Sequence, residues 1–281
     1  MTDCNIHPTA IIDKGAQIGK GVTVEPYAVI GEHVILKDGV TVRAHAYLDG
    51  HLTVGENTVI YPSAVIGTKA QHLRFNGEKT TIEIGKNCEI REFVTINSSV
   101  GDNGYVKIGD NCFIMAYCHI AHNCVLGNNV IMSNNSQIAG HVVIGNNVVM
   151  GGFVAIHQFV RVGDYSMIGG VSALGHDMPP YTLGGGIPFK IGGLNIVGLK
   201  RNQFSLHARQ NLSRAFRLLY RSKLHPKVAI ERIENELDQT PEILALVQFF
   251  RSSKRGLYGL HGVTRDEDVE FALEEELATC E

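Results

Sequence analysis

Hydrophobic residues recur along this chain with a period of six. Of the 29 positions from Ile6 to Leu174 whose numbers are multiples of six, 26 hold Ile, Leu, Val or Met, and the exceptions are His72, Glu78 and Asp102. A sustained fixed period is typical of stacked structural repeats. A period of six does not match an α-helix, which repeats about every 3.6 residues. The pattern therefore predicts a repetitive β architecture.

The residues between the aliphatic positions predict short strands joined by tight turns. Blocks such as IGKGVT, IGEHVI and LGNNVI place Gly or Asn close after the aliphatic residue. Both residues tolerate the left-handed backbone region that a sharp corner requires. Three blocks make one coil of 18 residues. We expect successive coils to stack as parallel strands about 4.8 Å apart around a triangular aliphatic core, so the predicted fold class is mainly β.

Two excursions interrupt the pattern, at about 67–83 and 97–107, and the pattern resumes in phase at Ile84 and Ile108. We expect them to replace coil edges without shifting the stack. After DMPPY the six-residue blocks stop, and GGGIPFKIGG is predicted to be a connecting loop.

Beyond this loop the apolar spacing becomes helical. Pro226 and Pro241 occur where helices are expected to begin. We therefore predict a parallel β-helix over residues 1–190, carrying both excursions, and a C-terminal α-helical domain over residues 191–281.

Composition narrows the class of protein. The chain has 281 residues, of which 44% are hydrophobic and 19% charged, so it can bury a full core. No apolar run approaches the roughly 20 residues that span a bilayer, and the first residues do not resemble a secretory signal. We expect a cytoplasmic protein without a transmembrane segment. The net charge of -3 argues against nucleic acid as a partner.

Five of the six cysteines occupy the fifth place of a block, which otherwise holds small or β-branched residues. They are Cys4, Cys88, Cys112, Cys118 and Cys124. A small core residue is a sufficient explanation for all five. No CxxC pair is present, and a spacing of six does not match a zinc site. We predict no metal and no cofactor.

Histidines gather at one place in the repeat. Because one coil has 18 residues, His122, Gly140 and Gln158 form a column on successive coils, flanked by His141 and His157. His122 occupies no core place, and neither does His119, three residues before it. Both are expected to face outward near a corner. A chain with 13 histidines can also cluster some of them by chance, in surface roles.

Several motifs occur in an order and spacing that carry a family resemblance. They are IHPTAII from Ile6, IREFVTIN from Ile90, HIAHNC from His119, IAGH from Ile138, IHQF from Ile156, DMPPY from Asp177 and NIVGLKR from Asn195. With them the whole chain resembles the hexapeptide-repeat acyltransferases, and most closely the bacterial UDP-N-acetylglucosamine acyltransferases that start lipid A synthesis. The resemblance implies a left-handed parallel β-helix and a homotrimer. It implies transfer of a (3R)-3-hydroxyacyl chain from acyl carrier protein to the 3-position of UDP-N-acetylglucosamine.

The resemblance also implies roles for the histidine column. His122 would be the general base that takes the proton of the sugar hydroxyl, since imidazole titrates near neutral pH. Gly140 would offer its backbone N–H to the oxyanion of the tetrahedral intermediate. Neighbouring residues would position the substrates or tune the base, and these are His119, His141, His157 and Gln158.

Further substrate contacts are implied outside the column. The first excursion would reach towards the active site of a neighbouring subunit, where Gln71 and Arg74 would hold the nucleotide sugar. Gly170 would leave room for a long acyl chain. Asn195 and Arg201 would touch the nucleotide.

Four residues depart from the family pattern. His72 stands where the family usually has Asp and Asn97 where many members have His, which leaves open whether the acceptor atom is a hydroxyl or an amine. Asn123 stands where Asp is frequent; because an amide cannot stabilise imidazolium as a carboxylate would, we predict a low pKa for His122. Val197 replaces a residue that is commonly acidic.

One segment is strongly basic. Residues 190–223 contain eight Lys or Arg and no Asp or Glu, whereas the tail from Asp266 contains eight acidic residues and no basic one. The basic segment is either an ordinary charged helix face or a docking surface for an acidic acyl carrier protein.

Two other functions compete with acyl transfer. A γ-class carbonic anhydrase uses the same repeat and binds zinc between subunits, for which His119, His122 and His141 are candidates, but their spacing does not fit that family. A non-enzymatic solenoid that binds a partner is the second alternative. The histidine column and the basic segment disfavour it.

Overall fold

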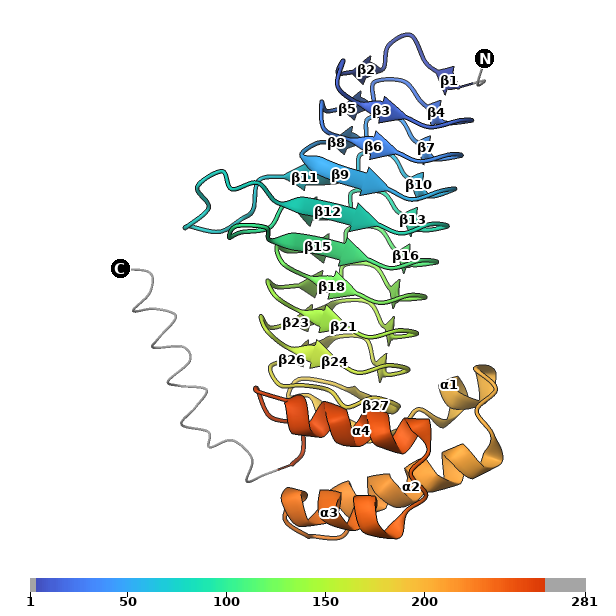
Figure 1. Cartoon of the computed structure of the whole chain (residues 1–281), viewed down its shortest axis with the longest axis vertical. Helices are drawn as coiled ribbons and strands as arrows, with labels where there is room; N and C mark the ends of the chain where they lie inside the picture. The colour runs from blue at the N-terminus through green and yellow to red at the C-terminus, as the bar shows by residue number, and fades with distance from the viewer. Residues whose placement is uncertain (1–3, 261–281) are drawn as a thin grey trace.

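The computed structural model describes residues 4–260, and in it three long parallel sheets form the faces of a β-helix (Figure 1). Sheet A contains β1 (Asn5–Ile6), β4 (Thr23–Val24), β7 (Thr41–Val42), β10 (Val59–Ile60), β13 (Glu89–Ile90), β16 (Phe113–Ile114), β19 (Ile131–Met132), β22 (Val149–Met150), β25 (Met167–Ile168), β27 (Thr182–Gly185) and β28 (Lys190–Leu194). Sheet B contains β2 (Ile11–Ile12), β5 (Val29–Ile30), β8 (Tyr47–Leu48), β11 (Val65–Thr68), β14 (Thr95–Asn97), β17 (His119–Ile120), β20 (Gln137–Ile138), β23 (Val154–Ile156) and β26 (Ser172–Leu174). Sheet C contains β3 (Gln17–Ile18), β6 (Ile35–Leu36), β9 (His51–Val54), β12 (Thr81–Ile84), β15 (Tyr105–Ile108), β18 (Val125–Leu126), β21 (Val143–Ile144) and β24 (Arg161–Val162).

The coils stack in register, as the period of six predicts. Across most of the stack each residue pairs with the residue 18 positions on, for example Thr23 with Thr41. Where the two excursions intervene the separation grows, because Val59 pairs with Glu89 and Glu89 with Phe113. The excursions lie between β11 and β12 and between β14 and β15, and the pairing continues beyond both.

The corner between sheets C and A carries a ladder of side-chain hydrogen bonds. The N–H of Asp110 donates to Oδ1 of Asn128 (2.7 Å), that of Asn128 to Asn146 (2.9 Å), and that of Asn146 to Asp164 (2.7 Å). The residue that follows each of these has a left-handed backbone, as at Asn129 with φ 57°. Short polar side chains therefore satisfy the corner N–H groups that the strands leave unpaired.

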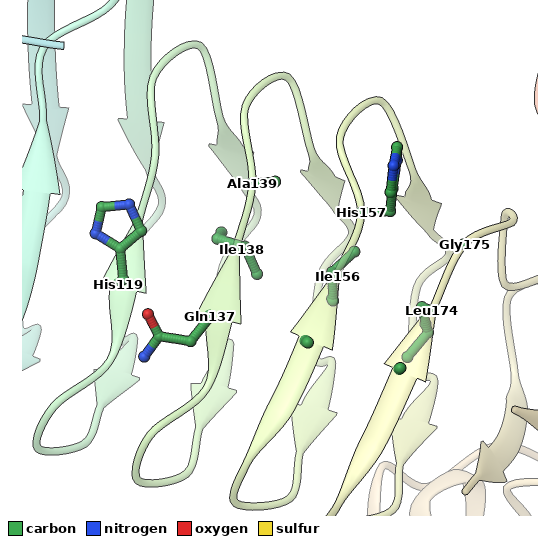
Figure 2. A pocket seen from close by; sticks show the side chains of 10 residues that line it. His119, Gln137, Ile138, Ala139, Ile156, His157, Leu174 and Gly175 are labelled. Carbon is green, nitrogen blue, oxygen red and sulfur yellow. The ribbon is translucent and has the colours of Figure 1, made fainter. Parts of the chain in front are cut away.

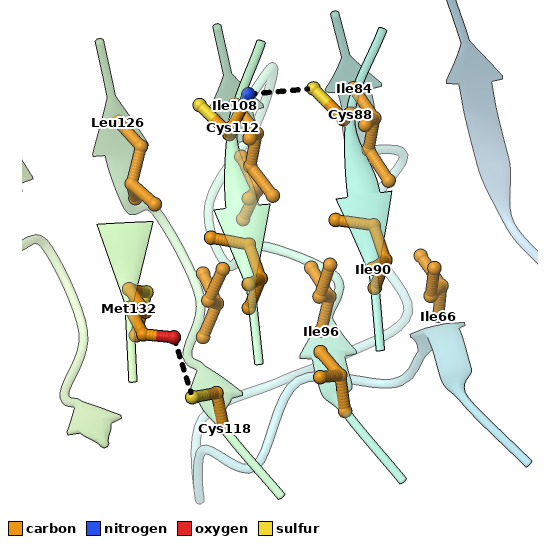
Figure 3. Close-up of a cluster of buried hydrophobic side chains, with 14 of the residues drawn as sticks. Ile66, Ile84, Cys88, Ile90, Ile96, Ile108, Cys112, Cys118, Leu126 and Met132 are labelled. Atoms are coloured by element: carbon orange, nitrogen blue, oxygen red, sulfur yellow. Dashed lines mark hydrogen bonds between the residues drawn. The ribbon is translucent and has the colours of Figure 1, made fainter. Parts of the chain in front are cut away.

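The aliphatic positions fill the core as predicted (Figure 3). Every Ile, Leu, Val or Met at a multiple of six from Val24 to Leu174 is at most 2% exposed, whereas Ile6 in the first coil is 43% exposed. A fully buried aliphatic side chain contributes roughly 1.5 to 3 kcal/mol. This column of stacked side chains is therefore the main source of stability.

Four of the predicted core cysteines are buried and hydrogen-bonded. Their thiols donate to backbone carbonyls of the next coil, as Cys88 to Gly109 (3.2 Å), Cys112 to Gly127 (3.2 Å), Cys118 to Ser133 (3.2 Å) and Cys124 to Ala139 (3.1 Å). All four are free thiols, and Cys4 is half-buried. The fifth place of a block thus holds a small side chain that also ties two coils together.

The predicted connecting loop GGGIPFKIGG is wrong, because most of it is a β-hairpin. β27 pairs in parallel with β25 and antiparallel with β28. Phe189 is buried in the core of the β-helix, and a Cβ on Gly184 would lie 2.7 Å from its ring. The glycines here permit close approach of an aromatic side chain, which a sequence pattern does not distinguish from loop glycines.

Four helices follow the hairpin. They are α1 (Ile196–Arg201), α2 (Leu206–Tyr220), α3 (Pro226–Glu236) and α4 (Pro241–Ser252). The predicted starts at Pro226 and Pro241 are confirmed. Leu212, Ile230 and Ile243 from three of these helices share a second hydrophobic core. Residues 261–281, including the acidic tail, lie outside the described part of the chain.

Within residues 4–260, none of these helices has the length and apolar character needed to cross a bilayer.

The core predicts unequal costs for two substitutions on β12. Ile84 is 2% exposed and points into the stack, whereas the neighbouring Glu83 is exposed and makes a surface ion pair with Lys107 (3.7 Å). We expect Ile84→Ala to lower the free energy of unfolding by about 2 to 5 kcal/mol and Glu83→Ala by less than about 1 kcal/mol. Urea unfolding of both variants measures the difference. Equal losses would contradict the inward orientation of Ile84.

Candidate active site

The histidine column lies at the corner between sheets B and C. His122 is in the turn after β17, and Gly140 and Gln158 take the same place one and two coils further on. His122 lies outside the hydrophobic core, and other side chains cover it so that it is only 7% exposed, which its place at a corner did not predict. Its ring meets the ring of His141 edge-on, with centroids 5.2 Å apart, and that of His72 at 5.0 Å. His141 in turn stacks on Phe159 at 4.6 Å.

Gly140 lets the imidazole of His122 lie directly on the backbone. A Cβ at this position would come 2.5 Å from Nε2 and 2.9 Å from Nδ1 of His122, so any side chain would displace the ring. Within residues 4–260 the N–H of Gly140 has no hydrogen-bond acceptor. The ring of His122 therefore lies against a residue whose backbone N–H has no acceptor in the described part of the chain.

His119 lies on the outer face of sheet B. It pairs across the sheet with Thr95 of β14, and its Nδ1 lies 2.7 Å from the Thr95 hydroxyl. A hydroxyl can donate or accept, so this contact orients the ring without selecting a tautomer. His119 is half-buried, consistent with an outward-facing place on a strand.

Burial lowers the pKa of three of these histidines. For His122, burial disfavours the charged ring and repulsion from His72 acts in the same direction, while the hydrogen bond to Asn123 opposes them, and the pKa falls below its usual value. Burial followed by repulsion from His122 lowers the pKa of His119 and of His141. All three rings therefore favour the neutral form, the form in which histidine accepts a proton.

A cavity of about 590 Å³ runs along sheet B beside His119 (Figure 2). Its floor consists of outward-facing residues paired across the strands, His119, Gln137, Ala155 and Ala173. Its rim follows the corner through Ala139, His157 and Gly175. Small apolar side chains leave an open groove that leads away from the histidines along several coils.

The remaining predicted residues are distributed over other parts of the chain. Gln71 and Arg74 are exposed on the first excursion, whose His72 lies against His122. Gly170 lies at the opposite edge of sheet B, in the turn between β25 and β26. Asn195 caps α1 by accepting from the N–H of Gly198 (3.0 Å) and donates to the carbonyl of Tyr165 (2.9 Å). Arg201 is exposed at the end of α1. Gln158 lies in the histidine column, and His157 lies beside it at the same corner.

Sequence reasoning missed how the excursions meet the column. Asn97, read only as a departure, is 4% exposed and donates to Thr68 Oγ1 and to the carbonyl of Lys69, both at 3.0 Å, which fixes the start of the first excursion. The contact of His72 with His122 was also missed. The excursions follow no period, so the arithmetic of the coils cannot locate their side chains.

The described residues contain no group of three His, Cys, Asp or Glu side chains placed to hold one metal ion. A stacked β-helix with a histidine column, a bare glycine backbone and an apolar groove is the architecture of a hexapeptide-repeat acyltransferase.

Comparison with known proteins agrees with this class. Residues 177–258 match the family described as UDP N-acetylglucosamine O-acyltransferase, domain 2, and residues 105–140 match the bacterial transferase hexapeptide repeat. Over 272 residues the chain is 58% identical to the acyl-[acyl-carrier-protein]–UDP-N-acetylglucosamine O-acyltransferase of Chlamydia trachomatis serovar L2, covering 96% of this chain and 95% of that protein. The chain belongs to the UDP-N-acetylglucosamine acyltransferase family.

Solved structures show the same fold. The UDP-N-acetylglucosamine acyltransferase from Campylobacter jejuni is similar with a TM-score of 0.85 at 39% identity, covering 90% of this chain and 99% of that one. The corresponding enzyme from Bacteroides fragilis gives 0.87 at 38% identity, with 89% and 98% covered. The predicted left-handed parallel β-helix and the predicted family are confirmed, and the carbonic anhydrase alternative is not favoured.

The buried histidines predict an acid-shifted titration. In the folded protein His119, His122 and His141 should each titrate below about 6.5, because burial disfavours their charged forms. NMR titration of histidine-labelled protein measures the three midpoints, and the same protein in urea supplies the unshifted reference. A midpoint for His122 above its unfolded value would contradict the burial of this ring.

Proposed function

We propose that this protein transfers a (3R)-3-hydroxyacyl chain from acyl carrier protein to the 3-hydroxyl of UDP-N-acetylglucosamine, the first step of lipid A synthesis. The sugar oxygen attacks the thioester carbonyl, and His122 takes the hydroxyl proton. The carbonyl oxygen becomes an oxyanion that accepts a hydrogen bond from Gly140. Collapse of the intermediate breaks the C–S bond, and His122 returns the proton to the leaving sulfur, which gives an ester and a free carrier thiol.

The observation that carries this proposal is the contact of a buried His122 ring with the backbone of Gly140, whose N–H is free within the described residues. His122 can accept a proton, and the backbone N–H of Gly140, in the residue that the ring contacts, can stabilise negative charge. The name of the C. trachomatis relative contains both substrates, acyl carrier protein with its acyl chain and UDP-N-acetylglucosamine. The groove beside His119 is a place where an apolar acyl chain can bind.

We further propose that the active form is a homotrimer. Large apolar side chains are exposed along the corner between sheets A and B, namely Tyr27, Phe93, Tyr117, Phe153 and Val171, each 48% to 64% exposed. A column of this kind is typical of an interface. Gly170 lies on this corner and the histidines lie on the other edge of sheet B, so two subunits would complete one site. Gly170 is then placed to limit acyl length, as the resemblance implies.

The basic segment is the proposed docking surface for the acidic carrier protein. Arg214 and Arg217 of α2 and Arg221, which caps this helix, line a cavity of about 510 Å³. Leu237 and Glu236 at the end of α3 also line it, and Glu236 is paired with Arg232. None of the eight cations between Lys190 and Lys223 forms an ion pair with an acidic residue in the described part of the chain. Positive charge that is not paired within the chain attracts an acidic partner.

The reaction is tested by acyl transfer from 3-hydroxyacyl carrier protein to UDP-N-acetylglucosamine. We expect His122→Ala to lower kcat by about 10² to 10⁴-fold, the usual contribution of a general base. His33→Ala, which removes an exposed histidine stacked on His51 near the N-terminal end of the β-helix, serves as the control and should keep full activity. Undiminished transfer by His122→Ala would refute the assigned base. If the intact protein is inactive, a 3-amino sugar nucleotide tests the other acceptor that His72 and Asn97 leave open.

The docking surface predicts a salt-dependent donor affinity. Arg217→Gln combined with Arg221→Gln should raise KM for the acyl carrier protein and flatten its dependence on salt, because screening weakens long-range attraction. The control Arg43→Gln removes a cation that is paired with Glu25, far along the β-helix. A short acyl-pantetheine donor lacks the carrier and should be used equally well by all variants. A KM for the carrier that is insensitive to salt in the intact protein would exclude this surface.

A further inference from the structure

A buried polar network connects the second excursion to the turn that holds His122. Ser99, two residues after the end of β14, is fully buried, and its hydroxyl oxygen accepts from the backbone N–H of Asn123 (3.0 Å). The N–H of Ser99 donates to the hydroxyl of Thr80, at the end of the first excursion (3.2 Å). Both excursions are therefore anchored beside the residue that follows His122.

The side chain of Asn123 pairs with the backbone of Val100 through two hydrogen bonds. The Val100 N–H donates to Oδ1 (3.1 Å), and Nδ2 donates to the Val100 carbonyl (3.1 Å). If the amide were flipped, its NH2 group would face the Val100 N–H and its oxygen would face the Val100 carbonyl, so neither hydrogen bond could form. This pairing therefore identifies which atom of the amide is the oxygen.

The identity of that oxygen decides the tautomer of His122. Oδ1 of Asn123 lies 2.9 Å from Nδ1 of His122. An amide oxygen only accepts, so Nδ1 carries the proton of the neutral ring and Nε2 keeps its lone pair. Nε2 is the ring nitrogen nearest a Cβ built on Gly140, at 2.5 Å against 2.9 Å for Nδ1. The free lone pair is therefore on the ring nitrogen nearer to Gly140.

We propose that Asn123, clamped by Ser99 and Val100 of the second excursion, is a positioning residue that holds His122 as the Nδ1–H tautomer, so that Nε2 is the atom that takes the substrate proton. The assignment of a substrate proton rests on the proposed function; the tautomer does not.

The first test reads the tautomer directly and needs no activity. Two-bond ¹⁵N–¹H correlation spectra of the intact, histidine-labelled protein distinguish Nδ1–H from Nε2–H imidazole. At a pH above its titration midpoint His122 should be the Nδ1–H form. An Nε2–H form would overturn the proposal. His119 is the internal comparison, because its partner Thr95 accepts or donates equally well.

The second test separates positioning from folding. We expect Asn123→Ala to lower kcat by roughly 10 to 100-fold, the range for losing the outer partner of a functional histidine, with little change in KM for the sugar nucleotide. The matched control is Asn129→Ala, because Asn129 has nearly the same left-handed backbone (φ 57° against 58°) at a corner away from the histidines. Equal losses in both variants would mean that only turn strain matters and would overturn the proposal.

The third test uses the pH profile. His72, His141 and His119 are the titratable groups around His122, and none of them changes in Asn123→Asp. The new carboxylate should stabilise imidazolium, so the acidic limb of the kcat profile should move to higher pH. An unmoved limb would show that residue 123 does not contact the base. Inactivity of the intact protein with both acceptors would refute the proposed function while the NMR result still stands.

Discussion

In-register stacking of coils is the constraint on which the rest of the structure depends. Because each strand pairs with the same place one coil away, a side chain at one position of the repeat forms a continuous column through the molecule. The inner columns hold the aliphatic core, and the C/A corner holds the ladder of polar side chains. The B/C corner carries the histidines. A departure from the period at one coil would rotate all later columns onto other faces, so both excursions leave the phase intact.

This constraint explains which features could be predicted from the sequence. The core, the parallel sheets and the column of His122, Gly140 and Gln158 follow from counting, because strand periodicity fixes where each side chain points. Counting fails where the backbone leaves the repeat. The hairpin around Phe189 looked like a loop because its glycines serve close packing. The partners of His122 in the excursions, His72 directly and Val100 through Asn123, were equally invisible, since no spacing rule connects them to the column.

The chemistry of the site combines low polarity with fixed dipoles. Burial lowers the pKa of His119, His122 and His141 and so favours their neutral forms. Residue 123 is an amide whose two polar atoms are both hydrogen-bonded. A neutral orienting group gives up stabilisation of imidazolium, yet it keeps the direction of the lone pair. The glycine in the next coil adds a donor with no side chain to move aside. In the proposed reaction the site would depend on preorganised geometry, which acts without reorganisation during the reaction.

The stacked pairing also governs how the chain can fold. Strand partners are separated by 18 residues in most of the molecule and by 24 or 30 at the excursions. All of these loops are short for a β-protein of this length, so contact order is low and the entropy of loop closure is nearly the same for each coil. A finished coil presents a complete edge on which the next can form. Assembly can therefore spread in both directions from any pair of coils, and the excursions, with their longer closures, are the points at which that spread slows.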